Sequence, residues 1–216
     1  RLCANGNAMM ITRHSFPLLH SLSFGTLAFL SAQAMAAPQS FTVVDAAGQP
    51  IASAAVSVIV KGAKTTAPAG TVVDMVQKNR RFTPAVLPVQ TGTAVNFPNL
   101  DTVRHHVYSF SPTRKFEIKL YAGTPAAPVL FDQPGVAVLG CNIHDQMVGW
   151  VVVLDTPYFA QTDAQGQALL EGMPAGAHQL RAWHARLPVD VTPPQQAIAL
   201  TEGDSTATVR LGGLQP

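Results

Sequence analysis

The sequence predicts an all-β protein. Short runs rich in valine, isoleucine and phenylalanine recur along the chain, and glycine, proline, asparagine and aspartate separate them at short intervals. No long segment combines the 3.6-residue periodicity of a helix with helix-capping residues. These two observations favour a β-sandwich or β-barrel architecture.

Fourteen segments have the composition of strands, each a run of apolar and β-branched residues that a turn former ends. In the first half of the chain they are residues 41–45, 54–60, 71–76, 85–90, 93–97, 105–110 and 116–121. In the second half they are residues 136–140, 148–154, 158–162, 168–171, 179–184, 197–201 and 206–211.

The N-terminal segment has the organisation of a secretory signal peptide. An uncharged apolar run extends from Phe16 to Leu30, and Ala34 and Ala36 supply the small residues that signal peptidase requires. The run is shorter than the roughly 20 residues of a spanning helix, so a membrane anchor is the weaker alternative. We expect residues 1–36 to be removed, with residues 1–8 as possible read-through upstream of the start, and the mature protein to be periplasmic.

Charge and length limit the function of the mature chain. Without residues 1–36 it carries twelve basic and twelve acidic side chains, which argues against nucleic acid, and against a strongly acidic surface, as an obligate partner. No later segment is long and apolar enough to span a membrane. About 180 residues remain, enough for one large domain or two small ones.

Cys141 is the only cysteine after the predicted signal, because Cys3 precedes it. A single cysteine cannot form an internal disulfide, so Cys141 needs another role. His144 and Met147 follow it closely, and a thiolate, an imidazole and a thioether are three of the four ligands of a mononuclear blue-copper site. His105, which follows an apolar strand and a loop, is the candidate for the second imidazole. We predict one type 1 copper ion held by these four residues.

Other interpretations of the same residues stay open. His106 competes with His105 as the ligand, since neighbouring strand residues point to opposite faces and only one of them can face the site. Cys141 and His144 could form a nucleophile and base, although they are only three positions apart and no oxyanion motif accompanies them. A structural zinc site normally uses more cysteines or histidines. A binuclear copper centre needs a second cysteine.

The run from Cys141 to Met147 resembles the ligand loop of the cupredoxins, and most closely the amicyanin type. His105-His106-Val107 is similar to the His-Asn-Val of that family. With Phe97-Pro98-Asn99 before it and Gly149-Trp150 after it, the pattern also looks like that of periplasmic proteins labelled methylamine utilisation proteins. The resemblance covers about residues 71–155. It implies a Greek-key β-barrel, copper ligands at His105, Cys141, His144 and Met147, and non-enzymatic electron transfer to a redox partner protein.

The sequence departs from the family pattern at His106 and in the ligand loop, where Asn142-Ile143 and Asp145 replace the proline-bearing loop of amicyanin. His106 stands where an asparagine usually ties the two ligand loops together, and its ring or its backbone N–H could take over that role. Asp145 places a carboxylate beside His144, which should favour Cu(II) and lower the reduction potential. That effect will be small if Asp145 points into solvent.

Two further patterns flank the copper motifs. Asp45-Ala46-Ala47-Gly48 and Asp163-Ala164-Gln165-Gly166 both read as tight turns, and together with Pro174-Ala175-Gly176 they resemble the halves of a carboxypeptidase-regulatory-like (transthyretin-like) β-sandwich. We predict that residues 62–155 form a cupredoxin domain inserted into a sandwich made of residues 37–61 and 156–216. A tandem arrangement, in which the sandwich only flanks the barrel, is the alternative.

The leading function is therefore single-electron transfer. A copper-handling protein that carries the metal as cargo, and a structural or binding sandwich with an accessory copper domain, are the alternatives. We expect Trp150 in the barrel core and Trp183 in the sandwich core. Six basic residues could form a patch for an acidic redox partner or simply a solvated face: Lys78, Arg80, Arg81, Arg104, Arg114 and Lys115.

Overall fold

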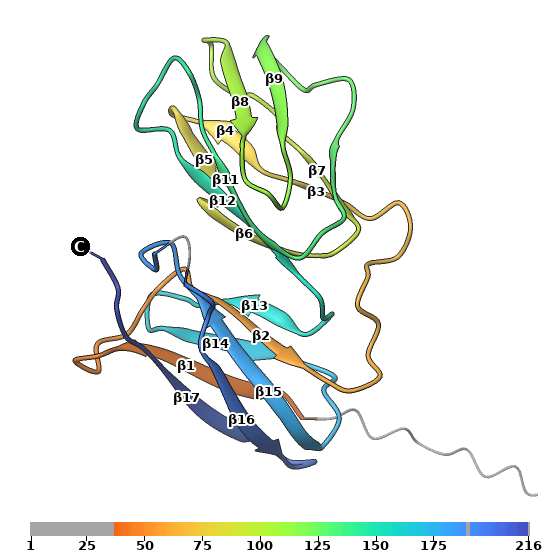
Figure 1. The fold of residues 1–216 in the computed structure, drawn as a ribbon, viewed down its shortest axis with the longest axis vertical. Helices are drawn as coiled ribbons and strands as arrows, with labels where there is room; N and C mark the ends of the chain where they lie inside the picture. Colours follow the sequence, from red (N-terminus) through yellow and green to blue (C-terminus); the bar gives the residue numbers. More distant parts are fainter. Residues whose placement is uncertain (1–36, 189–190, 216) are drawn as a thin grey trace, which may run out of the picture. The chain divides into compact units, whose positions relative to one another are not determined.

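The computed structural model describes residues 37–188 and 191–215. Throughout these ranges the chain forms 17 β-strands in six sheets and no helix (Figure 1), so the all-β prediction is confirmed. The predicted signal peptide lies outside the described residues. In the described part of the chain, no helix is long and apolar enough to cross a membrane.

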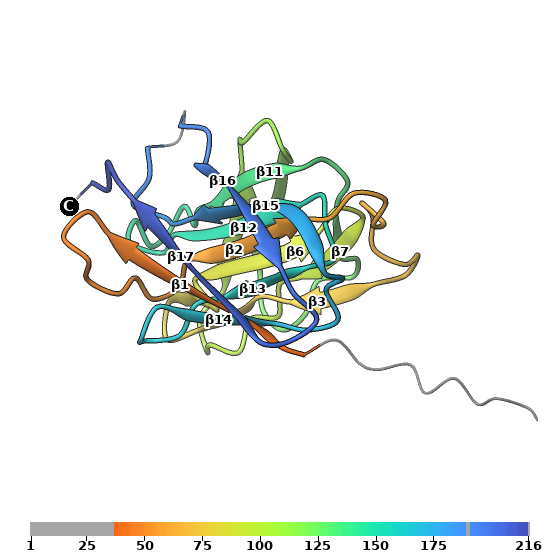
Figure 2. The same ribbon diagram turned by 90° about the horizontal axis from the view of Figure 1, so that it is seen from below.

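Two of the sheets combine the first two strands with the last five. One sheet has the order β14-β1-β17, with β1 antiparallel to β14 and parallel to β17; the other has the order β13-β2-β15-β16, with all neighbours antiparallel. Figures 1 and 2 both show β1 beside β17 and β2 beside β15. The bounds are β1 Gln39–Asp45, β2 Ala55–Ile59, β13 Phe159–Gln161, β14 Gln167–Leu170, β15 Gly176–Trp183, β16 Gln195–Leu200 and β17 Ser205–Leu211.

The two Asp-x-x-Gly turns form as predicted. In each of them the aspartate Oδ1, on Asp45 or Asp163, accepts backbone N–H groups two and four residues ahead, at 2.9 and 2.8 Å. Gly48 and Gly166 have φ of 84° and 71°. At Gly166 an added Cβ would also lie 2.6 Å from the carbonyl oxygen of Val43, so only glycine fits.

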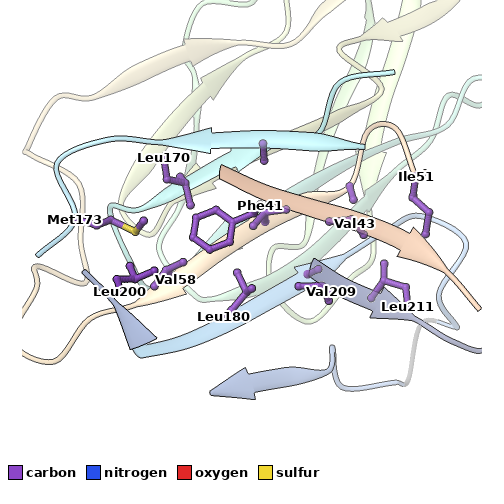
Figure 3. Close-up of a cluster of buried hydrophobic side chains, with 14 residues drawn as sticks. Phe41, Val43, Ile51, Val58, Leu170, Met173, Leu180, Leu200, Val209 and Leu211 are labelled. Atoms are coloured by element: carbon purple, nitrogen blue, oxygen red, sulfur yellow. The ribbon is translucent and has the colours of Figure 1, made fainter. Parts of the chain in front are cut away.

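Apolar side chains fill the space between these two sheets (Figure 3). Phe41 and Val43 of β1, and Leu180 of β15, are fully buried. Inward residues alternate along each strand because successive side chains of a strand point to opposite faces. The sheets therefore share one hydrophobic core.

The middle of the chain builds four other sheets, with orders β10-β7-β3, β11-β12-β6, β4-β5 and β8-β9. They enclose a second core, which includes Phe97, Val107, Leu139, Cys141 and Met147. Two pairs are parallel, β3 with β7 and β6 with β12. The bounds are β3 Val72–Asp74, β4 Val76–Lys78, β5 Arg81–Thr83, β6 Val86–Gln90, β7 Thr93–Asn96, β8 His105–Ser109, β9 Phe116–Tyr121, β10 Val129–Phe131, β11 Gly135–Leu139 and β12 Gly149–Leu154.

Three details differ from the sequence prediction. The strand expected at residues 71–76 is two strands, β3 and β4, because the ladder breaks at Met75. β5 and β10, each three residues long, were not predicted. The β4–β5 hairpin turns at Asn79 and Arg80, whose φ values are 55° and 57°. It lacks the glycine that normally marks such a turn.

Both tryptophans depart from their predicted locations. Trp183 belongs to a third, smaller cluster with Ala55, Val86, Val152 and Leu187, and Trp150 packs against the same cluster. Neither ring lies in the main cores, so the predictions for Trp150 and Trp183 were wrong. The reason is that β6 and β12 present apolar side chains on both faces, one toward the core and one toward the strands that flank it.

Candidate metal centre

The candidate centre forms where β8 begins and β11 ends. His105 is the first residue of β8, and Cys141 follows Gly140 directly after β11. Gly140 and Tyr108 exchange backbone hydrogen bonds of 3.0 and 3.1 Å, which join the two segments. An added Cβ at Gly140 would lie 2.6 Å from the Tyr108 ring. The close approach that glycine permits brings the Cys141 loop against the start of β8.

Three of the predicted ligands converge. His105, Cys141 and His144 each offer a donor atom, and these atoms all lie within 4.8 Å of one another. Cys141 Sγ lies 3.9 Å from His105 Nδ1 and 4.0 Å from His144 Nδ1. His105 is 0% and Cys141 4% exposed, whereas His144 is partly exposed. One imidazole is thus buried and the other lies near the surface.

Asp101 fixes the orientation of the buried imidazole. Its Oδ2 lies 2.8 Å from His105 Nε2 and accepts the backbone N–H of Arg80 at 2.9 Å, while Oδ1 accepts that of Asn79 at 2.7 Å. Burial acts to raise the pKa of Asp101, but these hydrogen bonds, together with the His105 ring, lower it overall. A carboxylate at Nε2 keeps the proton on that nitrogen and leaves the Nδ1 lone pair directed at Cys141.

Met147 closes the same loop. Its side chain is buried in the core that contains Cys141, and its backbone N–H donates to the carbonyl oxygen of His144 at 2.9 Å. Met147 and His144 also line one hollow at the surface. The loop therefore holds the Met147 thioether within the same local structure as the Cys141 thiol and the partly exposed His144 imidazole.

His106 has different surroundings from its neighbour. It is also buried, but its Nε2 lies 3.1 Å from Glu117 Oε1 on β9, in a geometry that forms no hydrogen bond. It is not among the residues that converge on Cys141. His178 is satisfied elsewhere, where its Nε2 pairs with the carbonyl oxygen of Pro174 at 2.8 Å. Within the described ranges, no other cluster of histidine, cysteine and acidic side chains has the spacing of a metal site.

The donor set fits copper better than it fits metals that prefer oxygen ligands or metals that are bound by several thiolates. One thiolate with two imidazoles is the trigonal set of a blue-copper site, and a buried thioether on the same loop is the usual weak fourth ligand. Structural zinc sites use closed sets of four cysteines and histidines. The two ligand-bearing segments also belong to a paired, buried framework, which keeps the donor atoms in place.

Sequence reasoning missed Asp101. Asp101 was not among the predicted site residues, although it stands only four positions before His105. Asn99 shapes that loop, since its Nδ2 donates to the carbonyl oxygens of Val103 and Tyr121 and its Oδ1 accepts the N–H of Asp101. The contacts of Asp101 with Asn79 and Arg80, and that of Asn99 with Tyr121, join segments 21 or 22 residues apart, so no local sequence pattern predicts them.

No protein-family model and no curated protein matches the chain. Among solved structures it is similar to a purple cupredoxin from Nitrosopumilus maritimus, with 24% identity over 38% of this chain and 98% of that one and a TM-score of 0.33. It is also similar to amicyanin from Paracoccus versutus, with 18% identity over 45% of this chain and 97% of that one and a TM-score of 0.32. A reduced amicyanin variant gives 18% identity, coverages of 45% and 98%, and a TM-score of 0.34. The chain, which is all-β with several sheets, therefore has cupredoxins among its structural neighbours.

Proposed function

We propose that this protein is a periplasmic type 1 copper protein that carries single electrons between redox partner proteins. The observation that carries the proposal is the convergence of His105 Nδ1, Cys141 Sγ and His144 Nδ1 within 4.8 Å. Met147 is the fourth ligand in this proposal. Bound copper would supply the chemistry by cycling between Cu(II) and Cu(I).

The residues of the chain would do the rest. Cys141 offers a buried sulfur donor, and Asp101 holds the His105 ring in the tautomer that leaves Nδ1 free. His144, the partly exposed ligand, lies nearest to solvent and provides the route by which an electron leaves. With Met147 as a fourth protein donor beside His105, Cys141 and His144, the chain would supply a complete ligand set for the metal, which favours a carrier over an enzyme.

We also propose that residues 62–155 form a cupredoxin domain inserted into a sandwich of residues 37–61 and 156–216. The strand order supports this division, since β1 and β2 pair only with β13 to β17 among the named strands. The separate hydrophobic cores support it too. The turns at Asp45 and Asp163 are consistent with a transthyretin-like sandwich.

An absorption spectrum tests the proposed centre. The chain from Ala37, loaded with Cu(II), should show an intense blue thiolate-to-copper band and a type 1 electron paramagnetic resonance signal. Cys141→Ser should abolish the band, and Met147→Leu should alter it without unfolding the protein, because leucine nearly conserves the buried volume. A colourless protein that binds copper weakly would refute the proposal.

The two adjacent histidines provide a matched pair of variants. His105→Asn should lose the blue band, whereas His106→Asn should keep it, since only His105 belongs to the group around Cys141. The opposite result would assign the ligand to His106. If both variants lost the blue band equally and circular dichroism showed both to be unfolded, the two histidines would have only a structural role in this comparison. The spectrum of Cys141→Ser would then decide whether the copper centre exists.

A further inference from the structure

We propose that the cationic surface beside the metal centre binds an acidic face of the redox partner, an inference that rests on the proposed function. The surface consists of Lys78, Arg80, Arg81 and Arg104, and we call it the basic edge. It includes the β4–β5 hairpin and the residue before β8. Arg114 and Lys115 of the sequence prediction are not part of it.

The basic edge is adjacent to the ligands. The backbone N–H groups of Asn79 and Arg80 donate to Asp101, which in turn contacts His105. Arg80 and Arg81 line the same hollow as His144 and Met147. A partner that docked against these arginines would therefore lie over the partly exposed ligand, His144.

The four cations of the basic edge lack counter-ions. All four are exposed, and none forms an ion pair within the ranges that the structure describes. Arg114, by contrast, lies 3.9 Å from Asp132. The carboxylate of Asp101 is turned inward toward His105, and Asp145 is the exposed carboxylate lining the hollow. Positive charge therefore dominates this end of the molecule.

Two features of the hairpin work against its own stability. Lys78 and Arg81 are directly opposed across the β4–β5 ladder, and like charges in that position repel. Arg80 has a φ of 57° at a turn position where glycine or asparagine is favoured, and a larger residue there costs about 1 kcal/mol. Neither feature helps the fold, and both add positive charge beside the ligands. An arrangement of this kind is expected at a functional surface.

Apolar residues complete the surface. Leu100 and Val103 are 62% and 38% exposed on the loop before His105, and Ile143 and Val148 are 46% and 39% exposed on the loop that carries His144. Protein interfaces combine an apolar centre with a polar or charged rim. The apolar residues would form the contact centre, and the basic edge would steer and orient an acidic partner.

Lys61 and Lys64, which lie beside the far end of β6 from the ligand loop, provide a control pair of cations. Lys61 and Lys64 are exposed, and the carbonyl oxygen of Lys64 accepts the side chain of Gln90 at 2.7 Å. Gln90 is the last residue of β6, whereas Val86, the first, pairs with Trp150 just after the ligand loop. A strand of this length separates the two ends by about 13 Å.

The test measures second-order electron transfer from the reduced protein to two ferric c-type cytochromes of similar potential, one acidic and one basic at pH 7. In each reaction the copper centre loses one electron and the haem iron gains it. Stopped-flow rates are compared at ionic strengths of about 10 mM and about 300 mM, between which the screening length falls from roughly 30 Å to below 8 Å. At low ionic strength the acidic cytochrome should react about tenfold faster than the basic one, and salt should reduce this preference.

Charge-reversal variants locate the effect. Lys78→Glu/Arg81→Glu should lose the preference for the acidic cytochrome, and Arg104→Glu, on the other segment, should reduce it several-fold. Lys61→Glu/Lys64→Glu changes the net charge by the same amount as Lys78→Glu/Arg81→Glu. It should keep most of the preference for the acidic cytochrome. An unchanged blue band in each variant shows that the centre has folded.

Three results would overturn the inference. The first is no preference for the acidic cytochrome at low ionic strength, and the second is an equal loss in the two double variants, which would assign the effect to net charge. In both cases the blue band and electron transfer remain, so the proposed function stands. The third is a wild-type protein without a blue band or without transfer to either cytochrome, which would overturn both proposals.

Discussion

Replacement of Asp101 by asparagine tests how the carboxylate supports the metal centre. Asp101 accepts three hydrogen bonds, from the backbone N–H groups of Asn79 and Arg80 and from His105 Nε2. An asparagine has nearly the same shape but only one acceptor oxygen. At least one of the three donors would then face an NH₂ group, and the remaining bonds would no longer have a charged acceptor.

The expected magnitudes follow from these contacts. One lost charge-assisted hydrogen bond corresponds to about 2 kcal/mol of unfolding free energy. The effect on the reduction potential depends on the distance from the Asp101 carboxylate to a metal bound at His105. The 2.8 Å contact between Asp101 and His105, the width of the imidazole ring and a metal–nitrogen bond of ~2 Å put that distance at about 7 Å. At an effective dielectric constant of ~20, one charge at that distance contributes about 2 kcal/mol, or about 100 mV for a one-electron couple. Removal of the negative charge disfavours Cu(II), so the potential should rise.

Protein-film voltammetry at pH 7 and urea denaturation of the metal-free protein measure the two effects separately. We expect Asp101→Asn to raise the midpoint by roughly 50–100 mV, to weaken copper binding by 10- to 100-fold, and to lower the metal-free stability by about 2 kcal/mol. Asp101→Glu retains the charge and should shift the potential much less. A midpoint that falls, or that rises by less than about 20 mV with copper fully bound, would refute the reasoning.

Three other predictions concern single residues. Gly140→Ala should destabilise the protein by about 1–3 kcal/mol in urea denaturation, because the new Cβ would overlap the Tyr108 ring. The control Gly203→Ala should change stability little, because no atom lies within 4 Å of a Cβ added there. Equal effects of the two substitutions would contradict this prediction. Asp145→Asn should raise the potential, but by much less than Asp101→Asn, because the Asp145 side chain is exposed and screened; a larger shift than that of Asp101→Asn would count against the assignment. Burial, with a nearby arginine, lowers the pKa of His184. The unfolded state therefore takes up a proton at a higher pH than the folded state does, and stability is lost as pH falls below about 6.5. His184→Gln should diminish that loss in denaturation curves recorded at pH 7 and pH 5.

The strand pattern of this protein was largely predictable because most strands are runs of apolar and β-branched residues between clear turn formers. The two that were missed have no such signal. β5 has two exposed polar residues out of three, and β10 is a short run close to prolines at both ends. Their pairing with β4 and β7 supplies the stability that their own sequences lack.

The candidate site could be predicted only where residue types and their spacing in the sequence identify the metal-binding side chains. Cys141, His144 and Met147 are close in sequence, so a local pattern identifies them. The choice between His105 and His106 depends on the strand register, and here the β8–β9 pairing is irregular between His105 and Val107. Both histidines are buried as a result, so alternation along the strand could not separate them.

Parallel pairing of β1 with β17 joins seven consecutive residues near the start of the described chain to seven near its end. The strands around Cys141 have their partners within the middle of the chain, so they close much shorter loops. Closing a loop costs conformational entropy before the contacts at its ends can form, and this cost grows with loop length. We therefore expect the central sheets to assemble first. The outer sheets would then close last, around a centre whose thiol is already enclosed, which limits the time during which Cys141 is open to oxidation.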